Sequence, residues 1–216
     1  MLGYWRDKQL LDEIAAAQPS LGYDGASWGV PDLSWLRVGQ NSRLFRGSIW
    51  GVVYPVFSRV ESVTFRGIAD ADLERCQGVM ERFSHPVELC LVSDKVTDLG
   101  LEAVARFKNV GGFALYSPDA RITDAGVARL RALPNLGTLT LDSRALTDQC
   151  VVEISRFPRL RQITLSGVPV SVRALEMLGQ MKTLKTLDLR SADVAEEALE
   201  KMAVLKDTRP DLDIMY

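Results

Sequence analysis

The chain has 216 residues, with 28 acidic and 26 basic side chains and a net charge of −2. Its 47% hydrophobic and 25% charged residues are typical of a globular protein and exclude a disordered chain. The balanced charge gives no overall basic field that would attract nucleic acid or anionic lipid. Cys76, Cys90 and Cys150 form no C-x-x-C pair, and there is a single histidine, so we expect buried free thiols and no zinc site.

The first 57 residues differ from the rest, because they hold every tryptophan: Trp5, Trp28, Trp35 and Trp50. Residues 6–17 predict an amphipathic helix, and residues 33–41 (LSWLRVGQN) carry an aliphatic spacing that returns later in the chain. We predict that residues 1–57 form a capping segment containing a degenerate repeat. The alternative is an aromatic surface that docks a second protein, since Trp and Tyr dominate interface hot spots.

Further along the chain, one strand-like pattern recurs at nearly constant spacing. Its copies are centred on Val63-Thr-Phe65, Leu89-Cys-Leu91, Phe113-Ala-Leu115, Leu139-Thr-Leu141, Ile163-Thr-Leu165 and Leu187-Asp-Leu189. Successive copies are 26, 24, 26, 24 and 24 residues apart. Alternating apolar residues predict strands with one buried and one open face.

Between these strands the apolar period becomes helical. Residues 96–107, 122–133 and 146–157 predict helices, and residues 170–178 and 194–202 are looser copies. The side chains expected to cap free amides at the helix starts are those of Thr97, Thr123, Thr147 and Ser171. Asp98, Asp124 and Asp148 follow the threonines, where they would lie near the positive end of each helix.

Six L-x-x-L-x-L copies followed by V-T-D-L-G-L-type segments resemble the leucine-rich repeat family, in its ribonuclease-inhibitor-like and bacterial L-T-D-x-G-L subclass. The resemblance covers residues 58–216. It implies an α/β, right-handed solenoid of about six to seven repeats, with a parallel sheet on the concave face and helices on the convex face. Residues 214–216 (Ile-Met-Tyr) predict a seventh strand that caps the C-terminal end.

This chain departs from the family motif at the ninth position, where Asn or Cys would bond the turn backbone. Asp94, Arg144, Val168 and Ala192 stand there instead. The turn backbone must therefore find other partners.

A search for chemistry gives little. His85 and Cys90 are the only conceivable acid–base and nucleophile pair, and a turn position explains His85 better than catalysis does. No phosphate-binding loop, G-x-S-x-G or H-E-x-x-H motif occurs. The arginines between Arg121 and Arg173 are interleaved with acids and favour helix ends over a nucleic-acid site. We predict no enzyme activity and no catalytic, cofactor-binding or metal-binding residues.

The remaining surface is the open face of the sheet, where we predict that a partner binds. The residues expected to contact it are Arg66, Val92, Tyr116, Thr140, Asp142, Thr164, Ser166, Asp188 and Arg190. Three columns of side chains supply about half of the 800 Å² per partner that a stable interface needs. We therefore expect help from the loops that follow the strands (Arg144, Val168, Ala192 and residues 117–121) or from the N-terminal aromatics.

The expected function is non-enzymatic recognition of another protein. We expect a cytoplasmic location, and the resemblance implies a bacterial adaptor or inhibitor, or an exported effector. We expect a monomer or weak dimer, no membrane association and no nucleic-acid partner. The alternative is a structural or self-associating unit that acts through exposed edges or the N-terminal aromatic segment.

Overall fold

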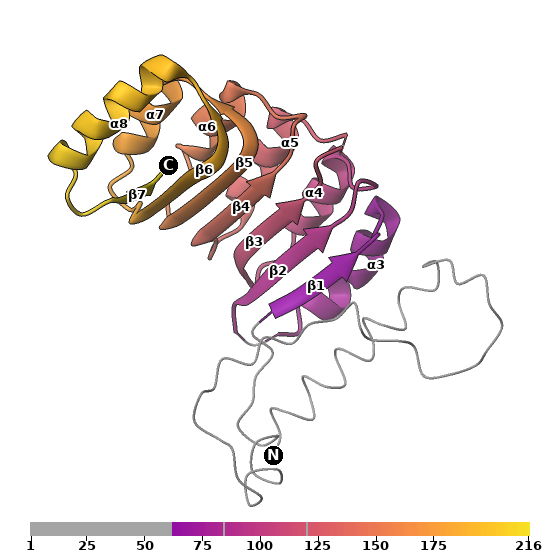
Figure 1. Ribbon diagram of the computed structural model, residues 1–216. Helices are drawn as coiled ribbons and strands as arrows, with labels where there is room; N and C mark the ends of the chain where they lie inside the picture. The colour runs from indigo at the N-terminus through magenta and orange to yellow at the C-terminus, as the bar shows by residue number, and fades with distance from the viewer. Residues whose placement is uncertain (1–61, 84, 120) are drawn as a thin grey trace, which may run out of the picture.

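The computed structural model describes residues 62–83, 85–119 and 121–216, in which seven parallel strands form one sheet in chain order (Figure 1). The strands are β1 (Ser62–Arg66), β2 (Val87–Val92), β3 (Val110–Tyr116), β4 (Thr138–Asp142), β5 (Gln162–Val170), β6 (Thr186–Val194) and β7 (Asp213–Met215). The helices are α3 (Asp70–Met80), α4 (Asp98–Ala105), α5 (Asp124–Arg129), α6 (Asp148–Ile154), α7 (Val172–Gly179) and α8 (Glu196–Thr208), with the short 3₁₀ turn η2 (Leu130–Ala132) after α5. The alternation of strand and helix predicted for residues 62–216 is confirmed, and the fold is solenoid-like.

Equivalent aliphatic residues of successive repeats lie side by side. Phe65 pairs in register with Leu91, Leu91 with Leu115, Leu115 with Leu141, and Leu141 with Leu165. All five side chains are essentially inaccessible to water. The buried positions of neighbouring repeats thus merge into one core that runs from β1 to β7.

The helices lie on one side of the sheet, each packed against the next (Figure 1). Four of them begin at the predicted caps, because Thr97, Thr123, Thr147 and Ser171 each accept a hydrogen bond from an amide of the first turn. The capping assignment is therefore confirmed.

The aspartates that follow the caps also join one repeat to the next. Asp98 accepts hydrogen bonds from the amide and the hydroxyl of Thr123, at 2.8 and 2.7 Å. The same two bonds connect Asp70 to Thr97, and they recur from Asp124 to Thr147 and from Asp148 to Ser171. We call these four pairs the Asp–Thr ladder. It adds an inter-repeat connection to the helix-dipole role expected from the sequence.

In the first two pairs of the Asp–Thr ladder, a glycine lies three residues after the threonine. A Cβ added to Gly126 would lie 2.1 Å from an Asp98 carboxylate oxygen, and one added to Gly100 would lie 2.4 Å from Asp70. The equivalent positions in the next two repeats hold Cys150 and Ala174. In those repeats the aspartate precedes its partner by 23 residues, against 27 and 25 in the first two. In the two longer connections a Cβ at the glycine position would therefore meet the carboxylate at 2.1–2.4 Å, so one of the two groups would have to move.

Serine supplies the turn partners that the missing asparagines would have given. The Ser93 hydroxyl donates to the carbonyl of Ile68 at 2.6 Å, and Ser117 donates to the carbonyl of Ser93 at 2.5 Å. Ser143, at the equivalent position, is fully buried and accepts from the amide of Ala145. These three backbone groups of the turns are thus bonded by serine side chains.

The last two long strands differ from expectation. β5 and β6 each contain nine residues, so Val168 and Ala192, expected in loops, belong to strands. Val168 is fully buried, and Ala192 packs against the core. Gly167, with φ of +66°, lies where the pairing of β5 with β6 shifts register. Neither Val168 nor Ala192 therefore adds a loop surface.

The C-terminal strand is confirmed as the seventh, since β7 pairs with the first half of β6 and buries Ile214. The predictions for residues 1–57, namely the capping segment, its helix and its degenerate repeat, lie outside the described residues.

Candidate functional site

The face of the sheet opposite the helices is covered by no helix or strand of the described residues (Figure 1). Its three rows of side chains follow the predicted columns over β1 to β5. The middle row is continuous to β6, where Thr140, Thr164 and Asp188 are register neighbours. The third row runs through Arg66, Val92, Tyr116, Asp142 and Ser166.

One member of the predicted set is displaced. Ser166 pairs with Ser191 rather than Arg190, because of the register shift between β5 and β6. Arg190 lies beside the third row, and Ser191 takes its expected place. The sequence analysis missed Ser191, since the register shifts between Thr164 and Ser166 and the repeat spacing of 24 residues gives no sign of it.

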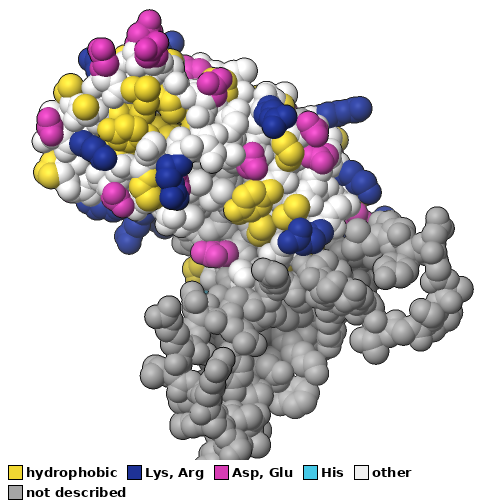
Figure 2. Space-filling model, viewed as in Figure 1, with side chains coloured by type: hydrophobic (Ala, Val, Ile, Leu, Met, Phe, Trp, Pro, Cys, Tyr) yellow, Lys and Arg dark blue, Asp and Glu magenta, His cyan; other side chains and the backbone are white. Residues whose placement is uncertain are grey.

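An apolar patch occupies the centre of this open face. Val92 and Tyr116 lie next to each other in the third row, beside Cys90 and Ala114 of the middle row. Tyr116 is 42% exposed, one of the few large hydrophobic side chains of the described residues left so accessible. Figure 2 shows the patch as a yellow area over β2 and β3, with a dark-blue and a magenta group on either side. The four apolar side chains are therefore contiguous on the open face.

Charges flank the patch along the same row. Arg66 is exposed next to Val92, and Asp142 is half-buried next to Tyr116. Neither side chain has an ion pair within the part of the chain that the structure describes. Partial burial raises the pKa of Tyr116, and the nearby Cys90 and Asp142 add to this effect. The phenol therefore stays neutral at physiological pH and can donate a hydrogen bond.

The polar end of the face is already paired internally. Arg190 forms two bonds to Asp188, at 3.0 Å from Nε and 2.7 Å from Nη2, and this pairing lowers the pKa of the Asp188 carboxyl. A shallow hollow of about 260 Å³ lies there, lined by Thr164, Leu165, Ser166, Asp188, Arg190 and Ser191. The hollow offers the hydroxyl groups of Thr164, Ser166 and Ser191 for hydrogen bonds, and its two charges neutralise each other.

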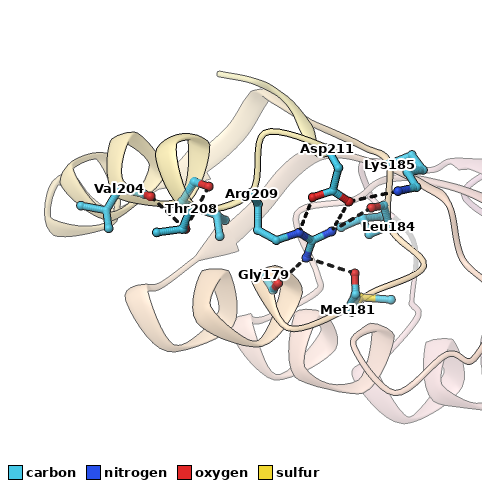
Figure 3. A network of polar contacts seen from close by, with 9 residues as sticks. Gly179, Met181, Leu184, Lys185, Val204, Thr208, Arg209 and Asp211 are labelled. Carbon is cyan, nitrogen blue, oxygen red and sulfur yellow. Dashed lines mark hydrogen bonds and ion pairs between the residues drawn. The ribbon is translucent and has the colours of Figure 1, made fainter.

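A second charged network lies at the C-terminal end, where Arg209 joins α8 to the preceding repeat (Figure 3). Its guanidinium donates to the carbonyls of Gly179 and Leu184, at 2.6 and 3.3 Å, and to both Asp211 oxygens. Lys185 also reaches Asp211, at 3.0 Å. Because these groups satisfy one another and the backbone, we interpret the network as a clamp that holds the last repeat.

The surroundings of Cys90, the candidate nucleophile, disfavour the thiolate form. Burial raises the pKa of the Cys90 thiol, and its hydrogen bond with Thr64 offsets this only in part. Nucleophilic cysteines need a lowered pKa. The His85 ring lies edge-on to Phe83, with ring centroids 6.3 Å apart. These contacts support a packing role for both residues.

The described residues contain no cluster of three or more His, Cys, Asp or Glu side chains that could hold a metal ion. Within residues 62–216 as described, no helix combines the length and apolar character needed to cross a bilayer.

Comparison with known proteins leaves the chain without an assigned family: no protein-family model matches it, and no match is found among curated proteins.

Proposed function

We propose that this chain is a right-handed leucine-rich-repeat solenoid of the helix-backed subclass, and that it recognises another protein on its open sheet face without catalysis. The in-register repeats, the V-T-D-L-G-L segments and the sheet with helices on one side support this assignment. An adaptor, an inhibitor or an effector would use this surface in the same way.

The observation that carries the proposal is the apolar patch formed by Val92, Tyr116, Cys90 and Ala114. Side chains on the other face of the same strands are completely buried by the helices. The open face has no packing role there, yet it leaves an aromatic side chain 42% exposed at its centre. Tyrosine is enriched at interface hot spots because it combines a large apolar ring with a hydroxyl group.

The area of the sheet face alone falls short of a stable interface, which takes about 800 Å² from each partner. With Val168 and Ala192 in strands, the turns after β3 and β4 remain as contributors. Pro118, Asp119 and Arg144 are exposed there, close to the third row. A partner that covers the patch can extend its contact over these two turns.

Affinity capture from the native host with the full chain as bait tests this proposal. Tyr116→Asp places a charge in the patch and should abolish capture of a specific partner. The matched control is Leu99→Asp on α4, because Leu99 is 63% exposed on the helix-covered side. That control should retain capture, and both variants should melt like the wild type. Equal capture by the two variants would reject the sheet face as the binding surface.

The alternative of self-association has its own observation. Leu199, Val204 and Tyr216 at the C-terminal end are each more than 40% exposed, and Figure 2 shows a second yellow area over that end. Sedimentation velocity distinguishes the two functions. A dimer that dissociates on Leu199→Glu favours self-association, whereas a monomer at all concentrations removes it.

A further inference from the structure

We propose that the partner presents an amphipathic helix that lies across β1 to β4 along the third row. An acidic residue of this helix contacts Arg66, two apolar residues contact Val92 and Tyr116, and a basic residue contacts Asp142. This inference rests on the proposed function and adds the structural class of the partner.

The order of the row defines the complementary sequence. Arg66, Val92, Tyr116 and Asp142 are register neighbours on four adjacent strands, so the row reads positive, aliphatic, aromatic, negative. The other two charges of the predicted set, Asp188 and Arg190, form an ion pair with each other. Among the described residues, the unpaired charges of the row, Arg66 and Asp142, are therefore of opposite sign and lie on either side of the apolar pair.

The spacing of the row matches a helix. Adjacent strands are about 4.8 Å apart, so Arg66 and Asp142 are about 14 Å apart across three intervals. A helix rises about 1.5 Å per residue, so residues three to four, seven, and ten to eleven positions along it are about 5, 10 and 15–16 Å from the first. These positions lie on one helix face and fall above Val92, Tyr116 and Asp142 in turn.

Backbone chemistry favours the helix over an extended segment. An extended chain across the patch would bring its amides and carbonyls onto Cys90, Val92, Ala114 and Tyr116, where only the phenol hydroxyl is a strong hydrogen-bonding group. Buried backbone groups need partners. A helix satisfies its own backbone and can rest on small side chains of the middle row, such as Ala114.

Designed probes test the inference. A three-helix bundle carries Glu, Leu, Leu and Arg at helical spacing on one exposed face, and two matched bundles carry Glu or Arg at both end positions. Binding to the full chain is measured by fluorescence anisotropy. Because exposed ion pairs are weak, the mixed-charge probe should bind the wild type about two- to tenfold more tightly than either matched probe.

Charge reversal in the chain should change the preference in a defined way. Arg66→Glu makes both ends of the row negative and should favour the Arg–Arg probe. Asp142→Lys makes both ends positive and should favour the Glu–Glu probe. Tyr116→Asp should weaken all three probes. Circular dichroism and melting curves establish that each variant is folded.

Two results would overturn the inference. One is equal binding of the three probes by all variants, or no binding of any, as expected if a second copy or another part of the chain fills the face. The other is tighter binding of an extended peptide with its charges four residues apart. If a native partner still depends on Tyr116 in either case, the helix inference fails while the proposed function stands.

Discussion

The Asp–Thr ladder makes a quantitative prediction about the glycine that follows it. Gly126→Ala normally stabilises a helix, because alanine is favoured over glycine by up to about 1 kcal/mol. In this chain the new methyl group would lie 2.1 Å from the Asp98 carboxylate. We expect the carboxylate to be displaced and both of its bonds to Thr123 to be lost.

The magnitude follows from those two bonds. Hydrogen bonds to a charged group contribute about 1.5–3 kcal/mol each when protected from water, and this accessible pair is worth about 2 kcal/mol together. After subtraction of the alanine gain, Gly126→Ala should destabilise the chain by about 1 kcal/mol. Once Asp98→Ala has removed the carboxylate, the same substitution should stabilise by up to about 1 kcal/mol. The coupling between the two sites is therefore about 2 kcal/mol.

Urea unfolding of the wild type, both single variants and the double variant measures this coupling. A difference of about 1 kcal/mol also shifts Tm by about 2–4 °C in a chain of this size. The matched control is the pair Asp148→Ala and Ala174→Gly, where a Cβ already coexists with the carboxylate. That pair should show a coupling near zero. Equal destabilisation by Gly126→Ala with and without Asp98 would refute the steric reasoning.

Three other results are expected. Arg209 lowers the pKa of the Asp211 carboxyl, so the ionised carboxylate stabilises the fold above its unfolded pKa, and this stabilisation is lost as the pH falls. Asp211→Asn should therefore flatten the decrease of the urea midpoint with falling pH below about pH 4, and an unchanged pH dependence would contradict this. Iodoacetamide should label half-buried Cys90 before the two buried thiols, whose pKa values burial raises further; simultaneous labelling would indicate global opening. Phe113→Ala should cost about 3–5 kcal/mol in urea unfolding, while Tyr116→Ala on the opposite face of β3 should change stability little; similar losses would contradict the assignment of faces.

Repetition explains why so much of the fold was predictable from the sequence. A residue such as Leu141 has equivalents 26 residues before and 24 after it, so its register and buried side follow from its neighbours. The caps were predictable for the same reason, because a hydroxyl recurs before each of four helices. The three rows of the open face followed from alternation alone over the first five strands.

The misses occur where one repeat differs from its neighbours. Arg190 was assigned to the third row by counting, but the register between β5 and β6 shifts after Thr164 and puts Ser191 there. The double role of Asp98 could not be found by counting either, since it depends on how close the carboxylate lies to Thr123 of the next repeat. Within the candidate site, the sequence identified the row but not which of its charges are paired.

The Asp–Thr ladder also bears on how the length of this protein can change. Each aspartate side chain binds the hydroxyl and amide one repeat ahead, so every junction between Asp70 and Ser171 has the same chemistry. A duplicated unit of 24 residues, such as residues 124–147, would find a threonine or an aspartate of the Asp–Thr ladder on each side. The duplication would lengthen the open face of the sheet by one strand, about 4.8 Å. After Ser171, Val172 stands where the earlier repeats have an aspartate, and α8 (Glu196–Thr208) has Ala195 at its N-cap, which makes no side-chain cap bond. Insertion of a repeat should therefore be tolerated between Asp70 and Ser171. Insertion at the C-terminal end should destabilise the fold, because it would separate Arg209 from its partners in the preceding repeat.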